Sequence, residues 1–224
     1  MQTFRTEAII LRRTNYGEAD RILNLLTPDR GKISVIAKGV RRSKSKLAGG
    51  LELFATSDVN IVEGRGEMGI VTAARLIKFY GNLLHDYERM QLGYEFIKIV
   101  NRVAETVAEA DFYFLLRDSF AYLNELTVES GVVELWFRLR FMALLGRGLN
   151  VATDSEGRAL AVDQAYNFDF QDMAFVAQAD GRFTTEHLKL LRLASAKDPA
   201  VLRQVSGIGQ ALEGCLFLVR SVES

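Results

Sequence analysis

The sequence contains few of the residues that build disulfides and metal sites. Its 224 residues include one cysteine, Cys215, and two histidines, His85 and His187. A lone cysteine excludes a disulfide within the chain and indicates a cytoplasmic location. Neither histidine has a cysteine or a second histidine at the spacing that zinc ligands need. We therefore expect neither a metal site nor a cofactor.

Membrane and catalytic signatures are missing as well. No stretch is long and apolar enough to cross a bilayer, and the N-terminal residues MQTFRTEAII lack the apolar core of a signal peptide. There is no phosphate-binding GxxxxGKS or GxxxxGKT, no GxGxxG after a strand and no nucleophile elbow. Glu18 and Asp20 are better explained as surface groups that orient Arg21 than as a catalytic pair. An enzyme is the least supported function class, and no membrane partner is expected.

The charges are balanced in number but not in position. Residues 1–80 hold 14 basic and 8 acidic side chains, a net charge of +6, and residues 81–224 carry the compensating −6. Hydrophobic residues make up 49% of the chain and charged residues 25%, as in ordinary globular proteins. The basic N-terminal part indicates a polyanionic partner, which the net charge of zero conceals.

Residues 1–80 have the pattern of a small β-barrel. Apolar, β-branched runs alternate with short turns, and Asp29-Arg30-Gly31 joins two of the runs into a hairpin. Closure into a barrel removes exposed strand edges, so a five-stranded OB-type barrel is the first choice and an SH3-like barrel the second. The expected strands lie within FRTEAIILRR, DRILNLLTP, KISVIAKGV, LELFATSDVNIVEG and EMGIVTAARLIKFY.

Residues 81–224 have helical periodicity, which makes the fold class α+β. Three amphipathic helices are expected before Gly146, the first with an apolar stripe that includes Tyr87 and Tyr94. An irregular acidic insertion follows at about 147–183, with a short β element at Ala174–Ala177. Thr184 then begins a helix, and two further short helices follow, the last near Gln210–Val222.

The acidic insertion could be mistaken for a cation site. Its aspartates do not have the spacing of an EF-hand loop, which needs alternating ligands and a final glutamate. A solvated acidic face is therefore expected.

The strongest local feature is the run KGVRRSKSK, residues Lys38–Lys46, with five basic residues in nine positions and no acid. We expect a flexible loop between strands, which suits phosphate contact because phosphates demand charge and reach. A solvated surface loop is the alternative explanation. Base stacking needs an aromatic ring beside the charge, and Tyr16 is the best candidate, whereas Phe4 and Phe54 are expected in the core. The predicted DNA-binding residues are Arg12, Arg13, Tyr16, Arg21, Lys32, Lys38, Arg41, Arg42, Lys44 and Lys46.

The N-terminal sequence resembles a known family, the RecO recombination-mediator proteins of bacteria. The resemblance rests on YGEADR at residues 16–21, Leu25 and Thr27 with DRGK at 29–32, AKGVR at 37–41 and LAGGL at 47–51. These strings occur in the order and spacing of the family over about residues 5–55. From there to about residue 146 only the layout of barrel and helices is similar.

The resemblance implies an OB-type domain at 1–80 and an α-helical domain at 81–224. It also implies a non-enzymatic DNA repair function: binding of single- and double-stranded DNA, annealing of complementary strands, and loading of RecA recombinase onto DNA coated by single-stranded DNA-binding protein. The implied protein partners are RecR, the C-terminal tail of single-stranded DNA-binding protein and, indirectly, RecA.

One departure from the family concerns zinc. Many members carry a four-cysteine zinc module after the helices, but residues 150–182 contain no cysteine here. The ligand count excludes that module, and packing of Tyr166, Phe168, Phe170 and Phe175 is expected to hold the region together. Two other function classes stay open: a protein adaptor without direct DNA binding, and an OB-type RNA binder.

Overall fold

The computed structural model describes residues 2–63, 66, 68–104, 110–203 and 207–223. The chain divides into two compact units, residues 1–124 and 125–224. The boundary that we predicted after residue 80 falls where strands give way to helices, inside the first unit. Among the described helices, none combines the length and the apolar character that crossing a membrane requires.

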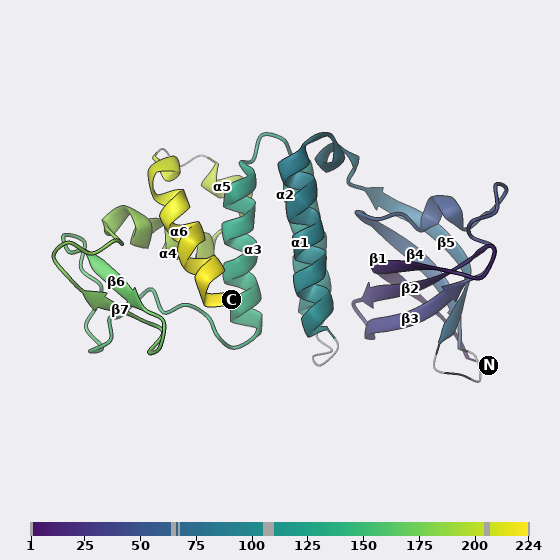
Figure 1. Ribbon diagram of the computed structural model, residues 1–224, viewed down its shortest axis with the longest axis horizontal. Coiled ribbons are helices and arrows are strands. Elements are labelled where there is room, and N and C mark those ends of the chain that lie inside the picture. Colours follow the sequence, from purple (N-terminus) through teal and green to yellow (C-terminus); the bar gives the residue numbers. More distant parts are fainter. Residues whose placement is uncertain (1, 64–65, 67, 105–109, 204–206, 224) are drawn as a thin grey trace. The chain divides into compact units, whose positions relative to one another are not determined.

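The first unit begins with the predicted five-stranded barrel (Figure 1). The strand order is β1-β2-β3-β5-β4, and β4 pairs with β1 to close the barrel. All neighbouring strands are antiparallel except β3 and β5, which meet in parallel through Val35 and Ile36. The strands are β1 (Thr3–Tyr16), β2 (Asp20–Thr27), β3 (Gly31–Ala37), β4 (Ala55–Val62) and β5 (Gly69–Phe79).

The barrel core consists of the inward-facing members of each strand, as period-two alternation requires. It contains Ala8, Ile10, Leu23, Leu25, Val35, Ala37, Val59, Ile61 and Val71. The run beginning at Leu51 forms a strand only from Ala55 onward. The residues before it include a short 3₁₀ turn, η1 (Ala48–Gly50), and Phe54 has a left-handed backbone with φ 54°.

A short 3₁₀ helix, η2 (Gly81–His85), and two long helices complete the first unit. These are α1 (Tyr87–Val103) and α2 (Ala110–Asn124). The predicted helix α1 is present, but the prediction of its buried face was partly wrong, because Tyr87 is 75% exposed and Tyr94 is 43% exposed. The buried face is centred on Gly93, where an added Cβ would lie 2.7 Å from the Phe54 ring. A glycine that makes room for an aromatic ring carries no apolar signal of its own.

The second unit packs α3 (Ser130–Leu144) against α4 (Thr185–Ala196), α5 (Pro199–Leu202) and α6 (Ile208–Glu223). The hairpin of β6 (Tyr166–Asp169) and β7 (Ala174–Ala177) joins the same core. Thr184 caps α4 as predicted, reciprocally with His187. The last helix, with 16 residues, is longer than expected.

Candidate nucleic-acid interface

Eight of the nine predicted basic residues gather at the end of the barrel where β1 ends, β2 begins and β3 ends. The β1–β2 pairing stops at Tyr16 opposite Asp20, and the β2–β3 pairing places Arg21 opposite Ala37. The turn Gly17–Ala19 and the basic loop Lys38–Lys46 therefore emerge side by side. We call this region the loop end of the barrel.

Backbone groups make the shortest attachments of the basic loop to the barrel, and the guanidinium of Arg41 adds a longer one to the Gly17 carbonyl at 3.4 Å. The amide of Gly39 donates to the Asp20 carboxylate at 2.7 Å, and the amide of Arg41 donates to the Ala19 carbonyl at 2.9 Å. Gly39 has a φ of 64°, which glycine adopts readily, and Val40 is buried. These bonds hold the first residues of the loop against the barrel, while the five cationic side chains, at positions 38, 41, 42, 44 and 46, are exposed.

Asp20 has a different role from the one we predicted. Its carboxylate accepts the Gly39 amide, while the guanidinium of Arg21 donates to the Asn15 side chain at 3.2 Å. The expectation that Asp20 orients Arg21 was therefore wrong. A carboxylate can accept several hydrogen bonds, and the amide of a neighbouring loop competes successfully with an exposed guanidinium.

Strand β1 adds two further cations and an aromatic ring to the loop end. The β1–β2 register shifts between Ile10 and Arg12, and the strand is exposed from Arg12 onward. Arg13 lies 3.5 Å from the Glu52 carboxylate, an exposed contact of little energetic value. Tyr16 is 55% exposed, so its ring is accessible for stacking.

Lys32 does not join this group. It lies opposite Leu26 near the start of β3, at the other end of the β2–β3 hairpin. Its ammonium donates to the main-chain carbonyl of Asn101 in α1 at 3.3 Å. Nearby, the guanidinium carbon of Arg30 lies 3.8 Å above the ring of Phe4. Phe54 is buried as predicted, whereas Phe4 is only half-buried.

Comparison with known proteins supports the resemblance of the N-terminal region. The family model described as recombination protein O, N terminal, matches residues 1–80. A DNA repair protein RecO from Heliobacterium modesticaldum is 34% identical over 146 residues, covering 65% of this chain and 52% of the relative. The RecO protein of Dehalococcoides mccartyi strain CBDB1 is 49% identical over 80 residues, covering 36% and 31%.

Residues 1–80 therefore resemble the N-terminal region of RecO proteins. The loop end lies within this region and contains the strings that carried the resemblance. The chain spans about half the length of the curated RecO relatives that it matches.

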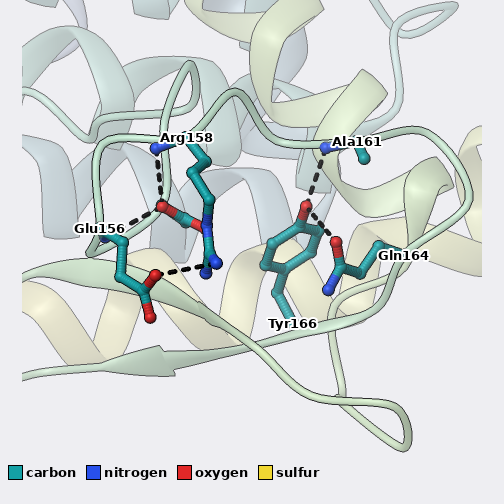
Figure 2. Close-up of polar contacts among 6 residues, drawn as sticks. Glu156, Arg158, Ala161, Gln164 and Tyr166 are labelled. Carbon is teal, nitrogen blue, oxygen red and sulfur yellow. Dashed lines mark hydrogen bonds and ion pairs between the residues drawn. The ribbon is translucent and has the colours of Figure 1, made fainter.

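Asp154 centres a compact turn that includes Glu156 and Arg158, and Figure 2 shows these two residues. Its carboxylate is buried, whereas Asp163, Asp172 and Asp180 of the same segment are exposed, as expected of a solvated acidic face. It accepts the amides of Glu156 and Arg158 at 2.9 Å and the Arg158 guanidinium at 2.9 Å. Desolvation opposes the charged carboxylate, but these bonds prevail and hold its pKa below the usual value.

Tyr166 closes the neighbouring turn. Figure 2 shows its hydroxyl between Ala161 and Gln164: it accepts the Ala161 amide at 2.8 Å and donates to Gln164 at 3.4 Å. The aromatic packing that we predicted is formed by Tyr166, Phe168 and Phe175, and Phe183 joins them. Phe170 packs edge-on against Phe168 at 5.2 Å between ring centres, although it is 45% exposed. Across the described residues, no cluster of three metal-ligating side chains occurs.

Proposed function

We propose that this chain is a RecO-type, non-enzymatic recombination mediator in DNA repair. It binds single- and double-stranded DNA through the loop end, anneals complementary strands and helps to load RecA onto DNA coated by single-stranded DNA-binding protein. One observation supports DNA binding above all: among the described residues, eight cations and Tyr16 share one end of the barrel with three carboxylates, Glu18, Asp20 and Glu52.

The cations at the loop end suit phosphates better than bases. Arginine and lysine side chains on turns and strand ends contact a polyanion through charge, without the fixed geometry that base recognition needs. Tyr16 can stack on any base because every base has a π face. We therefore propose binding with little sequence preference.

Salt dependence tests this proposal. If about five phosphates are neutralised, the slope of log K against log salt concentration for single-stranded DNA should be roughly −3 to −4. The variant Arg41→Glu/Arg42→Glu/Lys44→Glu/Lys46→Glu should lose at least a hundredfold in affinity at low salt, as measured by fluorescence anisotropy. Unchanged affinity would favour a protein adaptor without direct DNA binding.

Two further experiments separate the remaining alternatives. Competition between single-stranded DNA and RNA of equal length should favour DNA, and a preference for RNA would support the RNA-binder alternative.

A pull-down with single-stranded DNA-binding protein, with and without its C-terminal tail, tests the proposed partner. Retention that does not depend on the tail would contradict that part of the proposal, and a parallel experiment with RecR tests the second partner.

A further inference from the structure

One edge of β5 has no strand beside it along most of its length. Within the described residues β5 pairs with β4 on one side, but on the other side it pairs with β3 only through Gly69 and Ile70. The turn η1 lies against β5 at Ala74, where a Cβ added to Gly50 would be 2.5 Å from the main-chain carbonyl. Beyond that point, alternate peptide groups of Arg75–Phe79 point away from β4 and face no strand of the described chain.

The side chains along this edge are exposed, and three of them are large and apolar. Leu76, Ile77 and Phe79 are between 40% and 47% exposed. Proteins usually protect a free strand edge with charges, prolines or bulges. β5 has a bulge at Ile77 and two cations, yet its apolar side chains are still accessible. An edge of this kind suits the addition of an extended segment from a partner as a further strand.

The register with β4 sorts the side chains of the edge onto two faces. Leu76 and Phe79 lie opposite odd-numbered residues of β4, whose face includes the core residue Val59. Arg75 and Lys78 lie opposite even-numbered residues, on the other face. Because successive side chains of a strand point to opposite faces, a strand added here needs apolar residues on one face and charge-complementary residues on the other.

The positive charge of the edge exceeds that of the carboxylate it faces. Asp58, opposite Arg75, accepts hydrogen bonds from Nε of Arg5 at 2.8 and 3.0 Å, and its contact with Arg75 is longer, at 3.7 Å. Lys78 lies 5.1 Å over the ring of Tyr80, which has no formal charge to cancel that of the ammonium. A second copy of β5 in antiparallel pairing would place like charges on one face of the joint sheet. Charge complementarity therefore favours an acidic partner.

We propose that the edge Arg75–Phe79 binds an extended segment of a protein partner in which acidic and apolar residues alternate. The main chain of the segment bonds to the free edge of β5. Its acidic side chains lie beside Arg75 and Lys78, and its apolar side chains lie beside Leu76 and Phe79. Five strand residues span about 17 Å, so a short segment is sufficient. The surface uses none of the residues of the loop end, and the proposal does not depend on DNA binding there.

A designed peptide tests the chemistry of the edge. The probe has seven residues in which glutamate and valine alternate, and both of its ends are blocked. In anisotropy titrations Arg75→Glu/Lys78→Glu should bind it at least about tenfold more weakly than wild type, because two attractive contacts become repulsive. The same variant should bind the matching lysine–valine peptide at least about tenfold more tightly than wild type does, which also shows that it is folded.

The basic loop supplies the matched control. Lys44→Glu/Lys46→Glu changes the net charge by the same amount, and it should bind the glutamate–valine peptide within about twofold of wild type, since neither residue borders β5. An equal loss in the two variants would show that the peptide follows net charge alone, and it would refute a site on β5.

Amide hydrogen exchange locates the bound peptide. Exchange at residues 75–79 should slow when the peptide is saturating, while exchange at residues 38–46 stays unchanged. Protection confined to the basic loop, or equal affinity of wild type for the two peptides, would overturn strand addition at this edge. A large loss of DNA affinity in Arg75→Glu/Lys78→Glu with unchanged peptide binding would assign the edge to nucleic acid instead. The fourfold glutamate variant tests DNA binding at the loop end separately, so the two proposals can fail independently.

Discussion

The basic loop Lys38–Lys46 and the acidic segment 147–183 use their charges in opposite ways. In the loop, backbone amides make the shortest attachments to the barrel, and the cations are exposed to solvent, with a single long contact from Arg41 to the Gly17 carbonyl. In the acidic segment, the carboxylate of Asp154 is buried and its oxygens accept three hydrogen bonds from residues two and four positions later. The cations of the loop are therefore accessible to a binding partner, whereas the charge of Asp154 is used in hydrogen bonds that stabilise the acidic segment itself.

Local spacing explains this difference. The loop has no acid between Lys38 and Lys46, so its cations cannot be paired within the segment. In the acidic segment Arg158 follows Asp154 by four residues, and Gly157, with a φ of 79°, allows the tight turn between them. A charged segment without opposite charges at short spacing is therefore the better candidate for a binding surface.

Charge reversals of equal size in the basic loop and in the second unit give the largest expected difference in DNA affinity. Lys44→Glu/Lys46→Glu at the loop should weaken binding of single-stranded DNA more than tenfold, because two phosphate contacts become repulsive. Lys189→Glu/Lys197→Glu in the second unit changes the net charge equally and should cost less than twofold. Anisotropy titrations at one fixed salt concentration measure both, and equal losses would mean that only net charge matters.

Asp154→Ala should lower the stability of the second unit and leave DNA binding unchanged. The buried turn loses its central acceptor, and the melting temperature of the second unit should fall by roughly 5–10 °C. Fluorescence of the single tryptophan, the buried Trp136 of α3, reports on this unit selectively. Asp180→Ala, which removes an exposed contact to Gln178, is the control and should change little. DNA binding should be unaffected, and a loss would show that the two segments are not independent.

Acid should diminish the stabilisation from Asp154. Its pKa is lowered in the folded protein, so its contribution is complete above the unfolded value near 3.9 and is lost as pH falls through the folded value. The difference in melting temperature between wild type and Asp154→Ala should therefore be constant from pH 7 to pH 5 and shrink below about pH 4. A difference that grew on acidification would contradict this assignment.

Asp20 permits a finer test of the loop attachment. Asp20→Asn keeps an oxygen that can accept the Gly39 amide and removes a negative charge, so DNA binding should tighten about twofold. Asp20→Ala also removes the charge but loses the acceptor, so it should bind a few-fold more weakly than Asp20→Asn. Amide hydrogen exchange at Gly39 should accelerate only in the alanine variant. Identical behaviour of the two variants would show that the attachment does not matter for binding.

The sequence predicted the barrel because turn residues and apolar alternation repeat locally, as at Asp29-Arg30-Gly31. It also predicted the cations that meet at the loop end, since they lie next to strand ends. It could not reveal that Arg30 stacks on Phe4 or that Gly93 receives Phe54, because these partners are 26 and 39 positions apart. Such contacts depend on strand register and helix packing, which short-range patterns do not encode. Lys32 was grouped with the other cations for the same reason, although β3 carries it to the opposite end.

The smallest expected effect is that of a metal chelator on the second unit. In a zinc module, thiolates hold the loops together and chelation unfolds the domain. Here hydrogen bonds to Asp154 and the Tyr166 hydroxyl, with the ring packing of Phe168 and Phe175, connect the turns between residues 154 and 175. Millimolar EDTA should leave the Trp136-detected melting temperature unchanged, whereas Asp154→Ala lowers it. A fall on chelation that zinc reverses would show that a metal stabilises this unit after all.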